Sequence, residues 1–154
     1  TFVGLTALWE GDLICSAANK SAIGTLVERS TRFTILLHLP DGHDAKHVQQ
    51  AVIRKMRYLP KLLRNSLTWD QGSELALHKR ISTTLDMQVY FRDPHSPWQR
   101  GTNENTNGLL RQYFPKGTDL SAYPEDHLDA VAEELNDRPR KTLGYRKPSE
   151  KIGL

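Results

Sequence analysis

The stretch TALWEGDLIC, residues 6–15, alternates apolar and polar side chains and is rich in residues that favour β-structure. It predicts a strand with two distinct faces, one carrying Leu8, Glu10, Asp12 and Ile14 and the other carrying Trp9, Gly11 and Leu13. A carboxylate on the face of a sheet is costly unless it is paired or binds a metal. Asp12 is therefore a candidate functional residue, and Glu10 is its structural competitor on the same face.

The elements that follow predict an α/β fold. We expect further strands at 21–29, 33–40, 64–69 and 87–91, the last of them buried because its run is apolar. We expect helices from Asp44 to about Tyr58, from Ser73 to about Leu85, from 100 to 113, and from about Pro124 to Asn136. The first three strands have short connections, which is typical of an antiparallel meander. The last two strands each follow a helical crossover and should run parallel to a neighbour, which predicts a mixed sheet with helices packed on it.

Length and composition favour one soluble domain over residues 1–154, with 25% charged and 38% hydrophobic residues. No apolar run approaches the roughly 18 residues that a membrane span needs, and the start of the chain lacks a signal-peptide pattern. We therefore expect no membrane partner. The cytoplasmic location that we also expect is supported by the low cysteine count. The single cysteine, Cys15, excludes an internal disulfide framework and a zinc site made of several cysteines.

Basic residues are concentrated in RKMRYLPKLLR, residues 54–64, and in RPRKTLGYRKPSEK, residues 138–151. The sequence pI is about 9.1. Such clusters suit a polyanion, because each phosphate that is neutralised releases condensed counterions. The alternative is a solvated helix face for the first segment and a soluble tail for the second.

Asp70 is a second candidate acid, because it ends the strand 64–69 just before Gly72. In open α/β sheets, functional sites gather at the carboxyl ends of parallel strands. The alternative is an Asp that merely forms a turn.

Glu104 is the third candidate, in a segment rich in Asn and Gly. A helix over 100–113 would place on one polar stripe Arg100, Glu104, Asn107, Gly108 and Arg111. The opposite stripe, expected to face the core, would hold Thr102, Thr106, Leu109, Leu110 and Tyr113. An ion pair of Glu104 with Arg100 or Arg111 would explain only why this segment contains an acid. It would not explain the neighbouring Asn and Gly, which cost up to about 1 kcal/mol each relative to Ala inside a helix.

Five blocks of sequence resemble the transposases of bacterial insertion sequences of the thirty family, whose catalytic core is similar to retroviral integrase. In chain order the blocks are WEGDLI, SAIGTLVERSTRF, TWDQGSEL, DPHSPWQRGTNENTNGLLRQYFPKGTDLS and NDRPRKTLGYRKPSE. The resemblance implies a ribonuclease-H-like α/β fold, with a five-stranded mixed sheet of three antiparallel strands then two parallel strands and helices on both faces. It also implies a catalytic loop at about 93–100. Whole transposases of this family carry amino-terminal helix-turn-helix regions that recognise the element's ends, and we expect that region to be absent here.

The resemblance further implies a catalytic triad of Asp12, Asp70 and Glu104 that holds two Mg²⁺ or Mn²⁺ ions, with Asp12 shared between them. The implied reaction is metal-dependent phosphoryl transfer, in which water cuts the end of the element and the freed 3′-hydroxyl then attacks target DNA. Retroviral cores usually have Asn where this chain has Gln71. The resemblance therefore implies no role for the Gln71 side chain.

The implied partners are DNA, as transposon ends and as target, and further copies of the chain in a homo-oligomer at the bacterial nucleoid. The residues we expect at DNA are His95, Trp98, Gln99, Arg100, Asn107, Arg111, Lys116, Arg138, Arg140 and Lys141. Two of them have a structural alternative to DNA contact. His95 could be a loop residue hydrogen-bonded to the backbone, and Trp98 could anchor the loop in the core. The alternative functions are a catalytically inactive DNA-binding or dimerisation core and a simple metal-dependent nuclease.

Overall fold

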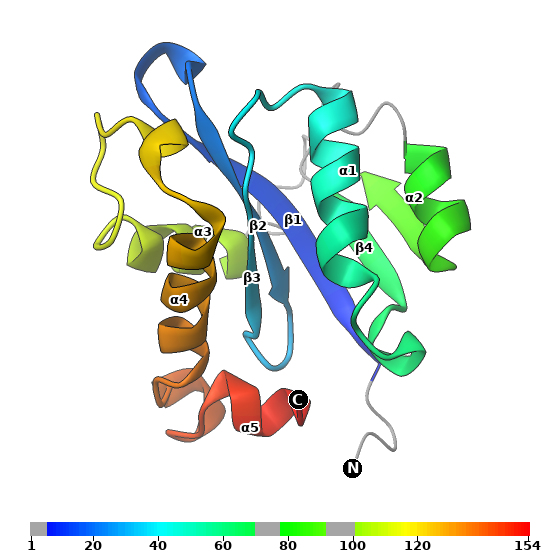
Figure 1. Cartoon of the computed structure of the whole chain (residues 1–154). Coiled ribbons are helices and arrows are strands. Elements are labelled where there is room, and N and C mark those ends of the chain that lie inside the picture. The colour runs from blue at the N-terminus through cyan, green and yellow to red at the C-terminus, as the bar shows by residue number, and fades with distance from the viewer. Residues whose placement is uncertain (1–5, 70–77, 92–100) are drawn as a thin grey trace.

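The computed structural model describes residues 6–69, 78–91 and 101–154, without the side chains of residues 101–104. Its single sheet consists of β1 (Leu8–Cys15), β2 (Ala22–Glu28), β3 (Thr34–Leu37), β4 (Ser66–Trp69) and β5 (Gln88–Phe91). The strand order is β3-β2-β1-β4-β5 (Figure 1). The β1–β2 and β2–β3 pairs are antiparallel, whereas the β1–β4 and β4–β5 pairs are parallel. The predicted mixed sheet is therefore confirmed, and β1, which carries Asp12, lies at its centre.

Different helices cover the two faces of the sheet (Figure 1). The helices are α1 (Ala45–Met56), α2 (His78–Leu85), α3 (Gly101–Leu110), α4 (Glu125–Asn136) and α5 (Pro148–Ile152). One core cluster joins Trp9 and Leu26 of the sheet to Val52 of α1 and Ile81 of α2. The other joins sheet residues such as Ile14, Ile23 and Leu36 to Leu110 of α3 and Leu128 of α4. Helices α1 and α2 thus lie on one face and α3 and α4 on the other, so helices cover both faces, as the resemblance implies.

Helix α1 begins where the sequence predicts. The Asp44 side chain caps it by accepting a hydrogen bond from the backbone N–H of His47, at 3.0 Å. Helix α4 also keeps its predicted bounds to within a residue, while α3 ends at Leu110 rather than 113. The predicted helix start at Ser73 and the predicted loop at 93–100 lie outside the described residues.

Strand β5 is not buried, so the prediction for residues 87–91 is wrong on this point. Tyr90 is 51% exposed and Phe91 is 44% exposed, although Met87, just before the strand, is buried. The reason is that β5 is the edge strand of the sheet. A short apolar run cannot distinguish an edge strand from a central one, because both have the same pattern along the chain.

The basic segment 138–151 is folded, so the reading of it as a soluble tail is also wrong. Arg140 and Arg146 form an antiparallel bridge, and α5 follows, with Pro148 in its first turn. Ile152 is fully buried in the core cluster on the α1 side of the sheet. The chain therefore returns to the core after α4. No helix in the described part of the chain is long and apolar enough to cross a membrane.

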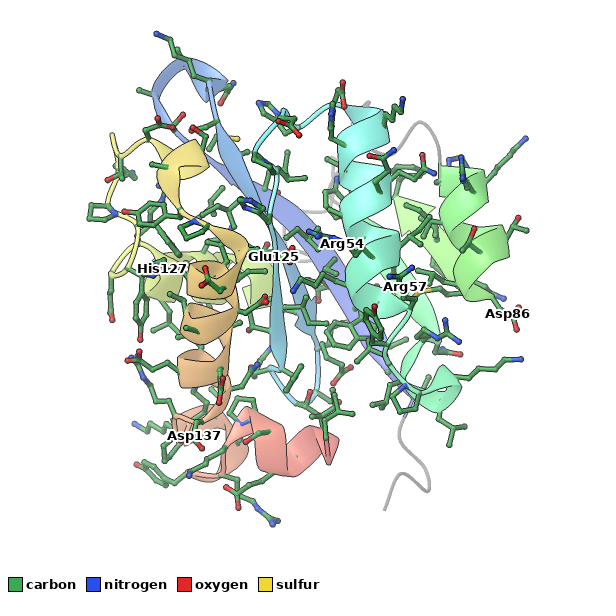
Figure 2. All side chains as sticks on the ribbon, viewed as in Figure 1. Arg54, Arg57, Asp86, Glu125, His127 and Asp137 are labelled. Atoms are coloured by element: carbon green, nitrogen blue, oxygen red, sulfur yellow. The ribbon has the colours of Figure 1, made fainter. Side chains whose placement is uncertain are left out.

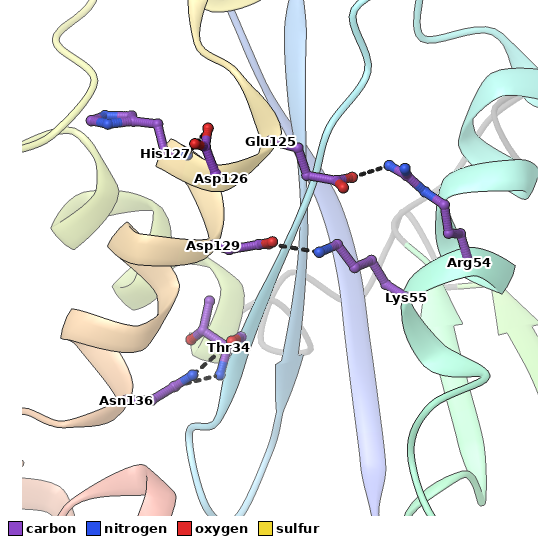
Figure 3. A network of polar contacts seen from close by, with 8 residues as sticks. All are labelled: Thr34, Arg54, Lys55, Glu125, Asp126, His127, Asp129 and Asn136. Atoms are coloured by element: carbon purple, nitrogen blue, oxygen red, sulfur yellow. Dashed lines mark hydrogen bonds and ion pairs between the residues drawn. The ribbon is translucent and has the colours of Figure 1, made fainter.

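Side chains of α1 and α4 meet across the other edge strand, β3 (Figure 3). Arg54 pairs with Glu125, and Lys55 pairs with Asp129 at 2.6 Å. The amide of Asn136 accepts from the backbone N–H of Thr34 at 2.8 Å and donates to its carbonyl at 2.9 Å. The two Asn136 bonds satisfy the backbone at the start of an edge strand, where unpaired groups would otherwise be exposed to further pairing.

Candidate active site

Asp12 lies on the central strand, partly exposed, with its carboxylate held between the backbone of Leu13 and α3. One carboxylate oxygen accepts from the backbone N–H of Leu13 at 2.8 Å. The other lies 3.4 Å from the amide nitrogen of Asn107, 95 positions along the chain. The Thr25 hydroxyl donates to the Asp12 carbonyl at 3.3 Å, which ties the same residue to β2. Asp12 is thus held at a defined position beside α3.

The register of β1 and β4 is set next to Asp12. Gly11 pairs with Trp69 in the parallel ladder. A Cβ at Gly11 would lie 2.2 Å from Cε3 of the Trp69 ring, so only glycine lets this ring pack against β1. The two paired residues directly precede Asp12 and Asp70 in the chain. Asp70 itself lies outside the described residues.

Helix α3 lies on the same face of the sheet as Asp12. Thr106 and Leu110 are buried, as predicted for the core-facing stripe. On the polar stripe, Asn107 contacts Asp12, and Arg111 donates to the Cys15 carbonyl at 3.0 Å and weakly to the Phe114 carbonyl at 3.4 Å. The helix is therefore fixed along β1 by both stripes. Position 104 lies in this helix, and its side chain is outside the described part.

Two other acids near β1 have structural roles. Glu10 is only 4% exposed and pairs with Arg29 at 3.2 Å, which supports its reading as the structural competitor. Glu28, which the sequence reasoning missed, is fully buried and accepts hydrogen bonds from the backbone N–H groups of Leu8, Ser30 and Thr31. The hydroxyls of Ser30 and Thr31 also donate to it. The signal was present as a Glu followed two and three positions later by hydroxyl residues in a turn.

Residues 6–97 match the family of the integrase core domain. The chain belongs to this family. Among curated proteins, this integrase core is 55% identical over 140 residues to the transposase for insertion sequence element IS1086 of Cupriavidus metallidurans, covering 91% of the chain and 41% of the relative. It is 56% identical over 144 residues to the transposase InsI for element IS30C of Escherichia coli, covering 94% of the chain and 37% of the relative. The chain thus spans about two fifths of the length of these relatives, and the resemblance noted from its motifs is confirmed.

The integrase core is also similar to the crystal structure of the catalytic core domain of BIV integrase. The TM-score is 0.68 at 19% sequence identity, covering 96% of this chain and 93% of the other. At that identity the likeness concerns the fold. The expected ribonuclease-H-like fold is therefore confirmed.

The basic residues expected at DNA have different surroundings in this integrase core. Arg138 donates to the Tyr113 hydroxyl at 2.8 Å, and that hydroxyl donates to Glu134 at 2.8 Å. Burial raises the pKa of Tyr113, and the hydrogen bond to Glu134 raises it further. Arg140 donates to the Leu135 carbonyl at 3.2 Å, and burial lowers its pKa. These two arginines are therefore partly engaged with α4 and with Tyr113, just after α3.

Lys116 and Lys141 are exposed. The other residues expected at DNA, His95, Trp98, Gln99 and Arg100, lie outside the described part. Within residues 6–69, 78–91 and 101–154, no group of three His, Cys, Asp or Glu side chains is placed to hold a metal. Of the expected triad, the structure thus describes the side chain of Asp12 and the backbone position of Glu104.

Proposed function

We propose that this chain is the catalytic domain of a DNA transposase that performs metal-dependent strand cleavage and strand transfer. Membership of the integrase core family and the identity of more than half to two transposases support this function. The observation that carries it is the position of Asp12, on the central strand and in contact with α3 through Asn107. Enzymes of this chemistry need carboxylates brought together from separate elements to bind divalent metals.

The proposed metal ligands are Asp12, Asp70 and Glu104. Two relations support this set. Asp70 follows Trp69, the residue paired with Gly11, and Asp12 follows Gly11. Glu104 precedes Asn107 by three positions in α3, and positions three apart lie on the same side of a helix.

The chemistry of the donors fits Mg²⁺ or Mn²⁺. Both are hard cations that prefer carboxylate and amide oxygens. Beside Asp12, the carbonyl oxygen of the Asn107 amide is buried and has no hydrogen-bond partner in the described part of the chain. An oxygen-rich site with spare acceptor capacity suits such a cation and its bound water. When bound, a pair of divalent ions activates the nucleophile and stabilises the leaving oxygen.

The residues of the chain act by holding these groups in place. The Leu13 N–H and the Asn107 amide orient the Asp12 carboxylate. Packing of Trp69 against Gly11 sets the spacing between β1 and β4. Buried Leu110 and the bond of Arg111 to Cys15 anchor α3, and with it position 104. Such preorganisation costs no rearrangement during the reaction.

The DNA in this proposal consists of transposon ends and target, bound by a homo-oligomer in the bacterial cytoplasm at the nucleoid. The proposed contacts are His95, Trp98, Gln99, Arg100, Asn107, Arg111, Lys116, Arg138, Arg140 and Lys141. Exposed Lys116 and Lys141 are the ones in the described part whose side chains are most available to phosphates.

Titration with Mn²⁺ tests the ligand set. The binding can be followed by tryptophan fluorescence, because Trp69 lies beside the site. We expect Asp12→Asn, Asp70→Asn and Glu104→Gln each to weaken Mn²⁺ binding and to abolish Mn²⁺-dependent cleavage and joining of DNA while the fold stays intact. Glu133→Gln, at an exposed position of α4, is the matched control and should bind Mn²⁺ normally. Unchanged Mn²⁺ affinity in Glu104→Gln would remove Glu104 from the site.

Products of the reaction distinguish the alternative functions. A transposase core cuts DNA and joins the 3′ end to a target duplex. Hydrolysis without joining would indicate a simple nuclease. DNA binding without either product, in the presence of Mn²⁺, would indicate an inactive binding or dimerisation core.

A further inference from the structure

A small groove between α1 and α2 lies on the face of the sheet opposite Asp12. Asp12 shares its face with Ile14, which packs with α3 and α4, whereas α1 and α2 pack on the other face. The groove has a volume of about 210 Å³ and is lined by Gln49, Gln50, Ile53, Arg54, Arg57 and Arg80. Among the described residues, its lining contains three guanidinium groups, two amides and no acid.

The positive charge of this groove is only partly neutralised. The sequence has no Asp or Glu from residue 45 to residue 69, so α1 itself supplies no counter-charge. Arg54 pairs with Glu125 of α4. In the described part of the chain, neither Arg57 nor Arg80 forms an ion pair, and both are exposed.

Arg57 is held at the end of α1, on the side of α2 (Figure 2). Its guanidinium lies 4.9 Å from the centre of the Tyr58 ring and donates to the Tyr58 hydroxyl at 3.0 Å. A stacked guanidinium keeps most of its N–H donors and has less freedom to lose on binding. Arg57 is therefore partly preorganised.

Like charges in one small groove repel each other, and an anion between them removes that cost. The planar guanidinium matches the geometry of phosphate oxygens with two parallel hydrogen bonds, and amides add neutral donors. The groove is smaller than the roughly 300–1,000 Å³ typical of small-molecule sites. Its size and charge suit a single phosphate group.

We propose that the groove between α1 and α2 binds a backbone phosphate of DNA, on the opposite face of the sheet from the metal site. DNA as the ligand rests on the proposed function. The groove adds to that function a second DNA contact that takes no part in the chemistry. It would hold a segment of DNA away from the cleaved strand and so stabilise the complex without touching the reacting phosphate.

The test is the salt dependence of DNA affinity, measured by fluorescence anisotropy with a labelled duplex and no metal. We expect Arg57→Gln and Arg80→Gln each to weaken binding several-fold at low salt. Each should also make the slope of log K against log salt shallower by about 0.9, the value for one phosphate contact. Lys79→Gln is the matched control, because Lys79 is exposed beside Arg80 on α2 but does not line the groove. It should change the slope by much less.

Each outcome decides the proposal. Wild-type affinity and slope in both arginine variants would overturn it, and so would an equal effect of Lys79→Gln, which would indicate general surface charge. Titration of the same variants with inorganic phosphate is a second measurement. If the arginine variants lose phosphate binding but keep wild-type DNA affinity, the groove binds a free anion, and DNA as the ligand is overturned. Arg80→Lys keeps the charge and should keep most of the slope, which guards against a folding defect. Failure of the proposed function is distinguishable, since a chain without Mn²⁺-dependent cleavage still reports DNA affinity.

Discussion

Replacing Gly11 by Ala perturbs the packing that sets the spacing of β1 and β4 beside Asp12. The new Cβ would lie 2.2 Å from Cε3 and 2.4 Å from Cζ3 of Trp69. Carbon atoms in contact normally lie about 3.5–4.0 Å apart, so the ring or the strand must move by about 1.3–1.8 Å. Trp69 is 1% exposed and packs in the core, so its ring has no free space to move into.

Overpacking of this kind typically costs about 1–3 kcal/mol of unfolding free energy. For a domain of this size each kcal/mol lowers Tm by about 2–4 °C, so we expect a decrease of about 2–12 °C. Urea denaturation followed by tryptophan fluorescence and circular dichroism measures the loss. Because positions 12 and 70 directly follow the displaced pair, we also expect weaker Mn²⁺ binding.

Gly108→Ala is the matched control for this prediction. A Cβ there would meet nothing within 4 Å, and Gly108 lies inside α3. Alanine in a helix interior is favoured over glycine by about 0.5–1 kcal/mol, so this variant should be more stable than the wild type. If Gly11→Ala were as stable as the wild type, the packing of Trp69 against Gly11 would not set the strand spacing.

Two further predictions concern the framework. Asn136→Ala leaves the backbone N–H and carbonyl of buried Thr34 without their partner. We expect urea denaturation to show a loss of about 2 kcal/mol or more in unfolding free energy. Glu133→Ala on the same helix is the control, and an equal loss there would contradict the prediction. The bond from the His47 N–H lowers the pKa of Asp44 below 3.8, so the stability it contributes is present above pH 3.8 and is lost as the pH falls through the lowered pKa. An Asn at position 44 can also cap the helix but does not titrate. The unfolding free energy of Asp44→Asn should therefore fall less than that of the wild type between neutral pH and pH about 3. Parallel curves of unfolding free energy against pH for the two proteins would exclude this role of Asp44.

Local features of the sequence were sufficient for much of the fold. Alternation along residues 6–15 predicts β1 and the face that carries Asp12. Asp44 predicts the start of α1, and helical periodicity predicts the core-facing side of α3 through Thr106 and Leu110. Each of these depends on interactions within one strand or a few helical turns, so neighbouring residues encode them. The family resemblance added the triad, which pattern alone could not identify.

Tertiary structure alone decided which distant residues meet. The exposure of β5 follows from its place at the sheet edge, and the burial of Ile152 follows from the return of the chain to the core after α4. The contact of Asn107 with Asp12 spans 95 positions, and that of Asn136 with Thr34 spans 102. Side-chain pairs this far apart depend on the order of the strands and the packing of whole helices. The sequence by itself therefore determined the strands and the four longer helices and named Asp12, while only the packed structure showed α5 and what holds Asp12 in place.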